Sequence, residues 1–305
     1  MNASHFLLVD GTNLAFRSFY GIQYLSNSQQ LPVNAIYGFF NSLLTLAQTH
    51  SFERAIICFD CGHATARTDI LDTYKKNRAP TPDDFKKQLP YIKELIPLFG
   101  WVCCERIGIE ADDLIATWAQ LATQRQQSVA IVSADKDLMQ CVTDTVHQIV
   151  PNSNGWYSLD PAGVVEKVGV YPHQIVDYLA LIGDSADNYL GLPGVGPKTA
   201  AKWLNAYQSI DGIYAHLSTV KPERFQSVLS QSRTLIERNQ SLARLACSID
   251  WIEPDCNPQP QPQALDAKLT ELNLNKLRGK CRQFFQQNLS ARTTHQPVQQ
   301  GEFCF

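Results

Sequence analysis

Acidic side chains crowd several short stretches of this chain, and the densest stretch is Gly108–Ala116. There Glu110, Asp112 and Asp113 stand just before an apolar run. The run Asp112–Leu121 has apolar residues at helical spacing, which predicts that these acids lie on the first turn of a helix. Acids in that position could only offset the helix macrodipole, or they could bind a cation if acids from other segments converge with them.

Further acids directly follow three short apolar runs that we predict as strands, at residues 5–9, 55–59 and 128–132. These acids are Asp10, Asp60, Asp135 and Asp137. A helical pattern at residues 34–48 separates the first two strands, and this order predicts a parallel sheet with crossover helices. Aspartates at strand ends are common turn formers, but the carboxyl ends of parallel strands share one edge, where sites form in open α/β sheets.

A fourth acidic stretch, Gly183–Asn188, contributes Asp184 and Asp187. Two like charges about 4 Å apart repel by about 4 kcal/mol at an effective dielectric of about 20, so converging carboxylates need neutralisation. The acidic motifs offer oxygen ligands without histidine or cysteine, which favours Mg²⁺ or Mn²⁺ over zinc. Two such ions about 4 Å apart activate a water molecule and stabilise the leaving oxygen of a phosphodiester. The acids therefore predict a two-metal site.

Residues 63–88 are polar and basic, and they include Tyr74, Lys75 and Arg78. The stretch is too long for an ordinary crossover and too charged for a core element. It could be a solvated, mobile loop. We favour a basic arch with an aromatic side chain that stacks on a base.

The sequence Gly194-Val195-Gly196-Pro197-Lys198 opens a predicted helix after the fourth acidic stretch. A Gly-x-Gly turn at a helix N-terminus exposes backbone N–H groups to an anion. The spacing differs from that of the nucleotide P-loop and suits a helix-hairpin-helix motif, whose glycines let a DNA backbone approach closely. Amphipathic helices are predicted onward to about residue 246.

The composition indicates a cytosolic protein, and we expect it to be cytoplasmic and associated with the nucleoid. The net charge of −3 does not favour nucleic acid, but acids and bases lie in different segments of the chain. Nine cysteines cannot all pair, so reduced thiols are expected, and a redox role for the pair Cys58 and Cys61 is the less favoured interpretation.

No stretch is long and apolar enough to predict a membrane span.

The motifs resemble, in order and spacing, those of the 5′-nuclease (flap endonuclease or 5′-3′ exonuclease) family, and most closely the 5′-nuclease domain of bacterial DNA polymerase I. The matching stretches are Val9-Asp10-Gly11, Phe59-Asp60, Gly108–Asp113, Ala134–Leu138, Gly183–Asn188 and Gly194-Val195-Gly196. The resemblance implies an α/β fold of the PIN-like type, with a mostly parallel central sheet and helices on both faces. It implies three regions: a nuclease core at 1–170 with a helical arch at about 63–100, a helical DNA-binding subdomain at 171–256, and a linker, short helices and a disordered tail at 257–305. Within the last region we expect one or two helices at about 264–288 and disorder in the last fifteen residues.

The resemblance also implies roles for individual residues. The first metal ion would be held by Asp10, Asp60, Glu110 and Asp112, with Asp113 beside them. The second ion would be held by Asp135, Asp137 and Asp187, with Asp184 acting through water; Mg²⁺ is expected and Mn²⁺ could substitute. The remaining implied residues are Lys75, Arg78 and Arg17 near the scissile phosphate, Tyr74 stacking on a base, and Gly194, Gly196 and Lys198 gripping the duplex, with K⁺ as a further ion there.

The implied reaction is hydrolysis of DNA phosphodiesters near single-strand/duplex junctions, leaving a 5′-phosphate, in replication and repair. Substrates would be a 5′ flap, a nick, a 5′ end or an RNA primer end, and the protein would act as a monomer without a membrane. The sequence ends at residue 305, so a nuclease separate from its polymerase is expected, with a DNA polymerase or sliding clamp as partner. The tail Gln299–Phe305 is either a clamp hook or, as we favour, a frayed end.

Three alternative functions fit parts of this pattern. A catalytically inactive protein of the same fold that binds branched DNA would keep the arch and the hairpin. A related RNA-directed nuclease would need neither of them. A phosphomonoesterase with the same two metals would leave the basic loop unexplained.

Overall fold

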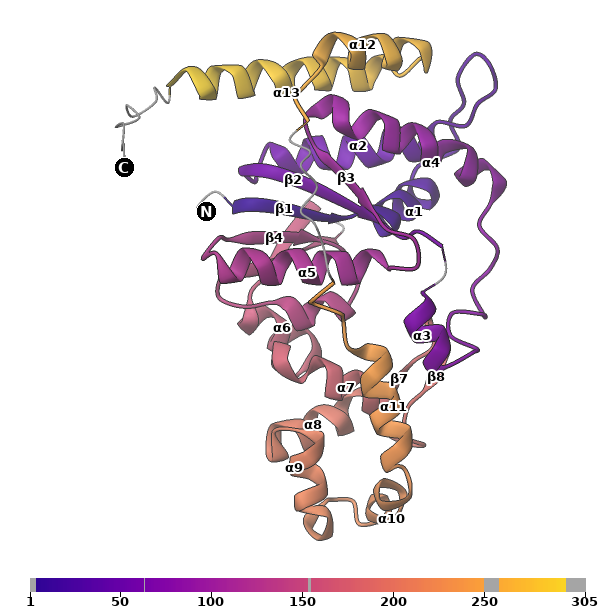
Figure 1. The fold of residues 1–305 in the computed structure, drawn as a ribbon, viewed down its shortest axis with the longest axis vertical. Coiled ribbons are helices and arrows are strands. Elements are labelled where there is room, and N and C mark those ends of the chain that lie inside the picture. Colours follow the sequence, from indigo (N-terminus) through magenta and orange to yellow (C-terminus); the bar gives the residue numbers. More distant parts are fainter. Residues whose placement is uncertain (1–3, 63, 153–154, 250–257, 295–305) are drawn as a thin grey trace, which may run out of the picture. The chain divides into compact units, whose positions relative to one another are not determined.

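A computed structural model describes residues 4–62, 64–152, 155–249 and 258–294 (Figure 1). The chain divides into two compact units. The first unit is built from residues 1–14, 50–82 and 102–256, and the second from residues 15–49, 83–101 and 257–305. All of the acids predicted to bind metal belong to the first unit.

The first unit contains a six-stranded sheet with the order β3-β2-β1-β4-β5-β6. The strands are β1 Ser4–Asp10, β2 Phe52–Phe59, β3 Val102–Glu105, β4 Val129–Val132, β5 Val146–Asn152 and β6 Gly155–Leu159. The first five strands of this order pair in parallel, and β6 is antiparallel to β5. The predicted mostly parallel sheet is therefore confirmed, whereas the sequence predicted no strand at β3.

Helix α5, Ala111–Gln124, packs its apolar side against this sheet. Its residues Leu114, Ile115 and Trp118 join a buried cluster with Phe6 and Leu8 of β1. The helix matches the predicted one, and Asp112 and Asp113 lie in its first turn as expected. Because the apolar stripe fixes the helix on the sheet, the acids of its first turn are fixed as well.

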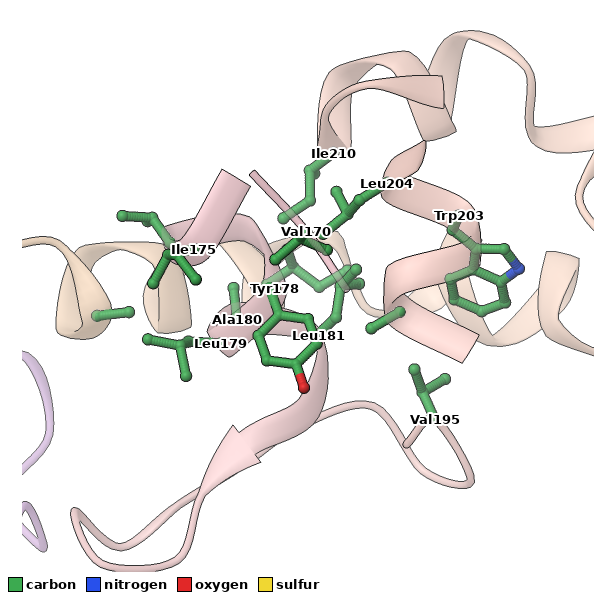
Figure 2. Packing of buried hydrophobic residues seen from close by; sticks show 14 of the residues in the cluster. Val170, Ile175, Tyr178, Leu179, Ala180, Leu181, Val195, Trp203, Leu204 and Ile210 are labelled. Atoms are coloured by element: carbon green, nitrogen blue, oxygen red, sulfur yellow. The ribbon is translucent and has the colours of Figure 1, made fainter. Parts of the chain in front are cut away.

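The rest of the first unit is mostly helical. Its elements are α3 Thr65–Ile70, η2 Asp137–Cys141, α6 Pro161–Val168, η3 Pro172–Gln174, α7 Ile175–Ile182, β7 Gly183–Asp184, β8 Tyr189–Leu190, α8 Pro197–Tyr207, α9 Ile210–Ala215, η4 Leu217–Thr219, α10 Arg224–Gln231 and α11 Arg233–Ala243. Figure 2 shows part of its core, in which Leu181 of α7 and Trp203 and Leu204 of α8 are fully buried. This second core fixes the segment that joins α7 to α8.

That joining segment doubles back on itself at two glycines. Gly183 has a φ of +76°, and a Cβ there would lie 2.2 Å from the backbone nitrogen of Gly191, so no larger residue fits. The fully buried Asn239 of α11 donates hydrogen bonds to the carbonyls of Ala180 and Leu190, at 3.1 and 2.8 Å. These contacts hold the acidic stretch 184–187 in place.

The second unit is helical. Helix α1, Gly11–Gly21, has its first residues in the first unit and the rest in the second unit. The other elements of the second unit are α2 Asn34–Ala47, α4 Asp83–Leu95, η1 Ile96–Phe99, α12 Pro262–Glu271 and α13 Asn275–Thr294. Phe99 stacks on Phe40 and Trp101 at ring distances of 5.0 and 4.4 Å. The helix predicted at 34–48 and the helices predicted near 264–288 are confirmed.

Helix α13 continues to Thr294, so residues 291–294, which were expected to be disordered, are helical. The expected clamp hook or frayed end at 299–305 lies outside the described residues. None of the helices that the structure describes combines the length and apolar character required to cross a membrane.

Candidate metal centre

Three of the predicted acids stand at one edge of the sheet. Asp10 ends β1, Asp60 follows β2, and Asp135 comes shortly after β4; β1 lies between the other two strands. Ser133 links two of them, because its hydroxyl donates to Asp10 Oδ2 at 2.9 Å and accepts from the Asp135 N–H at 3.0 Å. The strands β2 and β3 follow on one side of β1, and β4, β5 and β6 lie on its other side. The carboxyl end of β1 is therefore a topological switch point, where ligands bind in open α/β sheets.

The start of α5 brings further acids to this edge. Asp60 Oδ1 accepts a hydrogen bond from the Ala111 N–H at 2.9 Å, which ties the end of β2 to the first turn of the helix. Glu110 is the residue before that turn, and its carboxylate is buried. The N-terminus of α5 thus points toward the acids of the strand ends.

Burial and mutual repulsion raise the pKa values of two acids in this group. Burial, opposed by a hydrogen bond from the Asn13 N–H, and then repulsion from Asp60 and Asp135 raise the pKa of Asp10 to about 7. Burial and the charges of Asp10, Asp135 and Asp60 hold the pKa of Asp112 well above its usual value. Burial is the largest cause in both residues, and repulsion from the neighbouring acids adds to it, so a bound cation would favour the charged forms.

A second group contains Asp137, Asp184 and Asp187. One carboxylate oxygen from each residue lies within 4.8 Å of the others, and all three side chains are buried. Asp137 Oδ1 is buried and has no hydrogen-bond partner. Burial, followed by repulsion from Asp135, Asp187 and Asp184, raises the pKa of Asp137 well above its usual value. Three buried oxygen ligands with an unpaired one among them fit a hard divalent cation.

Two acids expected to serve the second ion have defined positions. Asp184, expected to act through water, stands directly among the three acids. Asp135, expected as a ligand of this ion, accepts the Asp137 N–H at 3.0 Å through its Oδ1. Asp135 therefore holds the backbone of Asp137 in place and links the second group of acids to Ser133 and Asp10 of the first group.

Basic residues from the segment before α4 reach into both groups. The Lys75 ammonium pairs with Glu110 and lies 3.8 Å from Asp187 Oδ1, and Arg78 Nη2 donates to the same Asp187 oxygen at 2.7 Å. Burial lowers the pKa of Lys75, but attraction to Glu110 and Asp187 outweighs it and raises that pKa overall. These two cations neutralise part of the acidic cluster.

The expected role of Tyr74 needs correction. Its side chain is only 5% exposed, and its hydroxyl donates to Asp187 Oδ2 at 2.9 Å and contacts Glu110 Oε2 at 3.3 Å. A ring buried in this way presents no face to a base. Tyr74 instead joins the two groups of acids.

Several residues of the site have no role predicted from the sequence. Lys136, between two aspartates, pairs with Asp184 Oδ2 at 3.0 Å. Asn77 donates to the Ser185 carbonyl and Asn188 to the Thr73 carbonyl, both at 2.7 Å, which fastens segment 73–78 to segment 185–188. No pattern of spacing distinguishes these polar residues from ordinary surface residues, because their partners are more than 100 positions away in the asparagine contacts.

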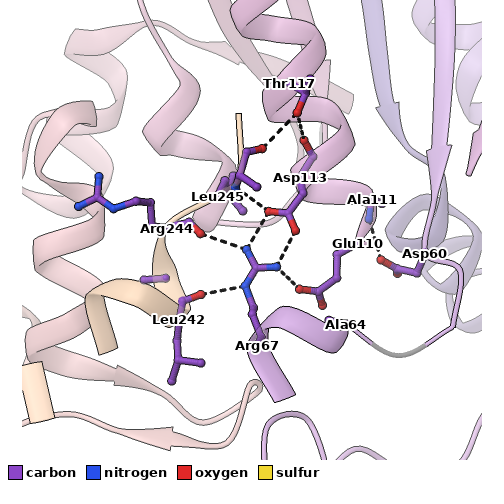
Figure 3. A network of polar contacts seen from close by, with 12 residues as sticks. Asp60, Ala64, Arg67, Glu110, Ala111, Asp113, Thr117, Leu242, Arg244 and Leu245 are labelled. Atoms are coloured by element: carbon purple, nitrogen blue, oxygen red, sulfur yellow. Dashed lines mark hydrogen bonds and ion pairs between the residues drawn. The ribbon is translucent and has the colours of Figure 1, made fainter. Parts of the chain in front are cut away.

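Arg67 was also missed as a site residue, although it belongs to the basic stretch. Its side chain is buried, and its guanidinium binds both oxygens of Asp113 as well as Glu110 (Figure 3). Asp113 Oδ1 also accepts from the Ala246 N–H at 2.9 Å. Asp113 was expected beside the first ion, and its carboxylate is occupied by Arg67 instead.

The other predicted residues lie elsewhere. Arg17 is exposed on α1 in the second unit. Gly194 has a φ of +75° in the turn before α8, Gly196 is the residue that precedes that helix, and Lys198 is exposed in its first turn. A Cβ on Gly196 would meet nothing within 4 Å, so the space beside it is open.

Two family models match the chain consecutively. Residues 5–169 match the N-terminal resolvase-like domain of 5′-3′ exonucleases, and residues 170–262 match their C-terminal SAM fold. The chain belongs to the 5′-3′ exonuclease family. The acidic cluster draws on both family domains, because Asp137 lies in the first and Asp184 and Asp187 lie in the second.

Sequence relatives agree with this family assignment. A 5′-3′ exonuclease of Aquifex aeolicus is 36% identical over 284 residues, which cover 92% of this chain and 96% of the relative. A thermostable DNA polymerase I of Thermus thermophilus is 36% identical over 275 residues, or 89% of this chain. The chain spans only about a third of that polymerase, since the match covers 32% of it.

Solved structures with the same fold are more distant in sequence. The T5 D15 protein co-crystallised with metal ions has a TM-score of 0.67 at 21% identity, with 92% of this chain and 98% of that chain covered. The catalytic core of Rad2 in complex with a DNA substrate has a TM-score of 0.60 at 14% identity, with 88% of each chain covered. Both show a shared fold.

Proposed function

We propose that this member of the 5′-3′ exonuclease family is a Mg²⁺-dependent, structure-specific nuclease. It hydrolyses DNA phosphodiesters near single-strand/duplex junctions, as an exonuclease and a flap endonuclease. The observation that carries this proposal is the buried cluster of Asp137, Asp184 and Asp187, with an unpaired oxygen on Asp137. Such a cluster is costly without a cation, because buried charges need partners.

Two ions are proposed, one at each group of acids. Asp10, Asp60, Glu110 and Asp112 surround the first position, and Asp137, Asp184 and Asp187 surround the second, with Asp135 between them. Bound divalent ions would supply an activated water and would stabilise charge on the leaving oxygen. Mn²⁺ meets the same demands for oxygen ligands and should substitute for Mg²⁺.

Lys75 and Arg78 are proposed to bind the scissile phosphate. Both contact acids that are proposed as metal ligands, Glu110 and Asp187. When divalent cations neutralise those acids, the two basic side chains become available to an anionic substrate at the same place. Arg17 is proposed as a further contact to the substrate backbone.

The turn before α8 is proposed to grip the duplex. The exposed Lys198 and the open space beside Gly196 allow a phosphate to approach the N-terminus of this helix. A K⁺ ion bound by the turn would bridge the protein and the DNA backbone.

The deciding experiment is cleavage of a 5′-labelled double-flap DNA in Mg²⁺ or in EDTA, by the wild type and by Asp137→Asn. We expect cutting near the junction that requires both the metal and Asp137. An exposed aspartate, Asp144, provides the matched control Asp144→Asn, which should cut like the wild type. Tight binding of flap DNA without cutting in Mg²⁺ or Mn²⁺ would instead support an inactive junction-binding protein.

Partners are proposed from the relatives. Because relatives named DNA polymerase I carry this region within a longer chain, a polymerase is the proposed functional partner. A sliding clamp is the second proposed partner, and residues 299–305 are the less favoured candidate for its contact. The test deletes residues 295–305 and measures binding to clamp and polymerase in a pull-down with the purified proteins. Lost binding would make the tail the contact, and unchanged binding would exclude it.

A further inference from the structure

Arg67 uses its whole guanidinium within the protein. The Nη1 and Nη2 groups donate to the two Asp113 oxygens at 2.7 and 2.8 Å, and Nη1 also donates to Glu110. The Nε group donates to the Leu242 carbonyl at 3.0 Å, and Nη2 donates to the Arg244 carbonyl at 3.2 Å (Figure 3). These contacts account for all five N–H donors of an arginine, so none remains for a substrate.

We propose that Arg67 is a positioning residue of the metal centre, which fixes the Glu110 carboxylate and withdraws Asp113 from the ligand set. This inference rests on the proposed function. Glu110 has a long side chain with several rotamers, and a guanidinium in a fixed place restricts them before the metal arrives. Groups that orient metal ligands commonly change metal affinity or activity by about 10–100-fold when they are removed.

Asp113 serves this arrangement as the holder of Arg67. Its Oδ1 accepts from both Arg67 and the Ala246 N–H, and its Oδ2 accepts from Arg67. Thr117, one turn later on α5, donates its hydroxyl to the carbonyls of Asp113 and Ala246, at 2.8 and 3.2 Å. The end of α11 and the segment after it are therefore bound to the same helix that carries Glu110.

The positioning of Glu110 requires the planar shape of the Arg67 guanidinium as well as its positive charge. Lysine carries one compact ammonium group with three donors, which cannot bind Asp113 in a bidentate manner while also contacting Glu110 and two carbonyls. The variant Arg67→Lys should therefore resemble Arg67→Gln. Wild-type behaviour of Arg67→Lys would overturn the positioning role.

The test is a double-mutant cycle with Arg67→Gln, Asp113→Asn and the combined variant. Two amides at these positions can hydrogen-bond to each other, so the combined variant avoids an unpaired buried charge and should fold. Mg²⁺ binding is measured by calorimetry and by the shift in melting temperature, and cleavage of flap DNA is measured across Mg²⁺ concentrations. Arg282→Gln, at an exposed arginine of α13, is the matched control.

We expect Arg67→Gln to weaken Mg²⁺ binding by about 10–100-fold and to leave the KM for DNA at saturating Mg²⁺ unchanged. The combined variant should bind Mg²⁺ no more weakly than Arg67→Gln alone, because Asp113 acts through Arg67. If the losses of Mg²⁺ affinity in the two single variants multiply in the combined variant, Asp113 binds the ion independently of Arg67, and the proposal is overturned. If the wild type does not cleave DNA, the proposed function fails, and the calorimetry still decides the role of Arg67.

Discussion

Replacing Asp137 by asparagine should stabilise the metal-free protein while it reduces the stabilisation by Mg²⁺ to what the first group of acids alone provides. The oxygens of Asp137, Asp184 and Asp187 lie within 4.8 Å of one another. At 4.8 Å, the largest separation in this set, each pair of charges repels by about 3.5 kcal/mol at an effective dielectric of about 20, so the two pairs that include Asp137 sum to about 7 kcal/mol before any neutralisation. Lys136 and Arg78, bound to the other two acids, and partial protonation of Asp137 offset most of this repulsion.

We expect a net gain of about 2 kcal/mol in the free energy of unfolding, because the amide keeps the shape of the side chain and can donate to the neighbouring carboxylates. This gain corresponds to an increase of about 4–8 °C in melting temperature. The assay is thermal unfolding of the wild type, Asp137→Asn and the exposed control Asp144→Asn, in EDTA and in millimolar Mg²⁺.

In EDTA the Asp137 variant should melt above the wild type. In Mg²⁺ the difference should shrink or reverse, because the wild type, which keeps both groups of acids, gains more stability. A variant that melts below the wild type in EDTA would refute the reasoning, because the carboxylate would then be stabilising rather than repelled. An equal Mg²⁺ response in both proteins would also refute it, because the cluster would then not bind the ion.

Three further outcomes are expected. In EDTA the free energy of unfolding of the wild type should fall by up to about 4 kcal/mol as pH rises. The raised pKa of Asp10 causes this fall: its stabilisation is complete below pH 3.8, the ordinary pKa of an aspartate, and is lost as pH rises to its folded pKa of about 7. Asp10→Asn should flatten this profile, and a stability that rises with pH would contradict it. Tyr74→Phe should cost about 1 kcal/mol of stability through the lost bond to Asp187 and leave DNA affinity intact, whereas weaker DNA binding at equal stability would restore a stacking role. Lys198→Ala should weaken DNA binding and reduce the slope of log affinity against log salt by about one, and an unchanged slope would remove this phosphate contact.

The parallel sheet and its acidic edge could be predicted because they depend on local signals. Apolar runs that end in Asp10, Asp60 and Asp135 mark both the strands and the edge at which they stop. The helix after Glu110 follows from its apolar spacing. Strand β3 escaped prediction because its four residues include two cysteines and end in glutamate, which gives no strong strand pattern.

The parts that could not be predicted depend on partners far away in the sequence. Nothing near Arg67 indicates burial, because its carbonyl acceptors are 175 and 177 positions away. Tyr74 resembled a surface aromatic for the same reason, since Asp187 is 113 positions away. Spacing alone therefore identified the acids, but it could not distinguish possible ligands from the residues that orient them.

The ties from Arg67 to Leu242 and Arg244 bear on the order in which the chain is made. A ribosome releases the segment with the strand-end acids well before α11 emerges, and domains fold as units during synthesis. Until α11 arrives, Arg67 has no acceptor at those two carbonyls, and until residues 184–187 arrive the second group of acids is incomplete. At least one of these supports of the acidic centre is therefore missing from the nascent chain until residue 244 has been synthesised.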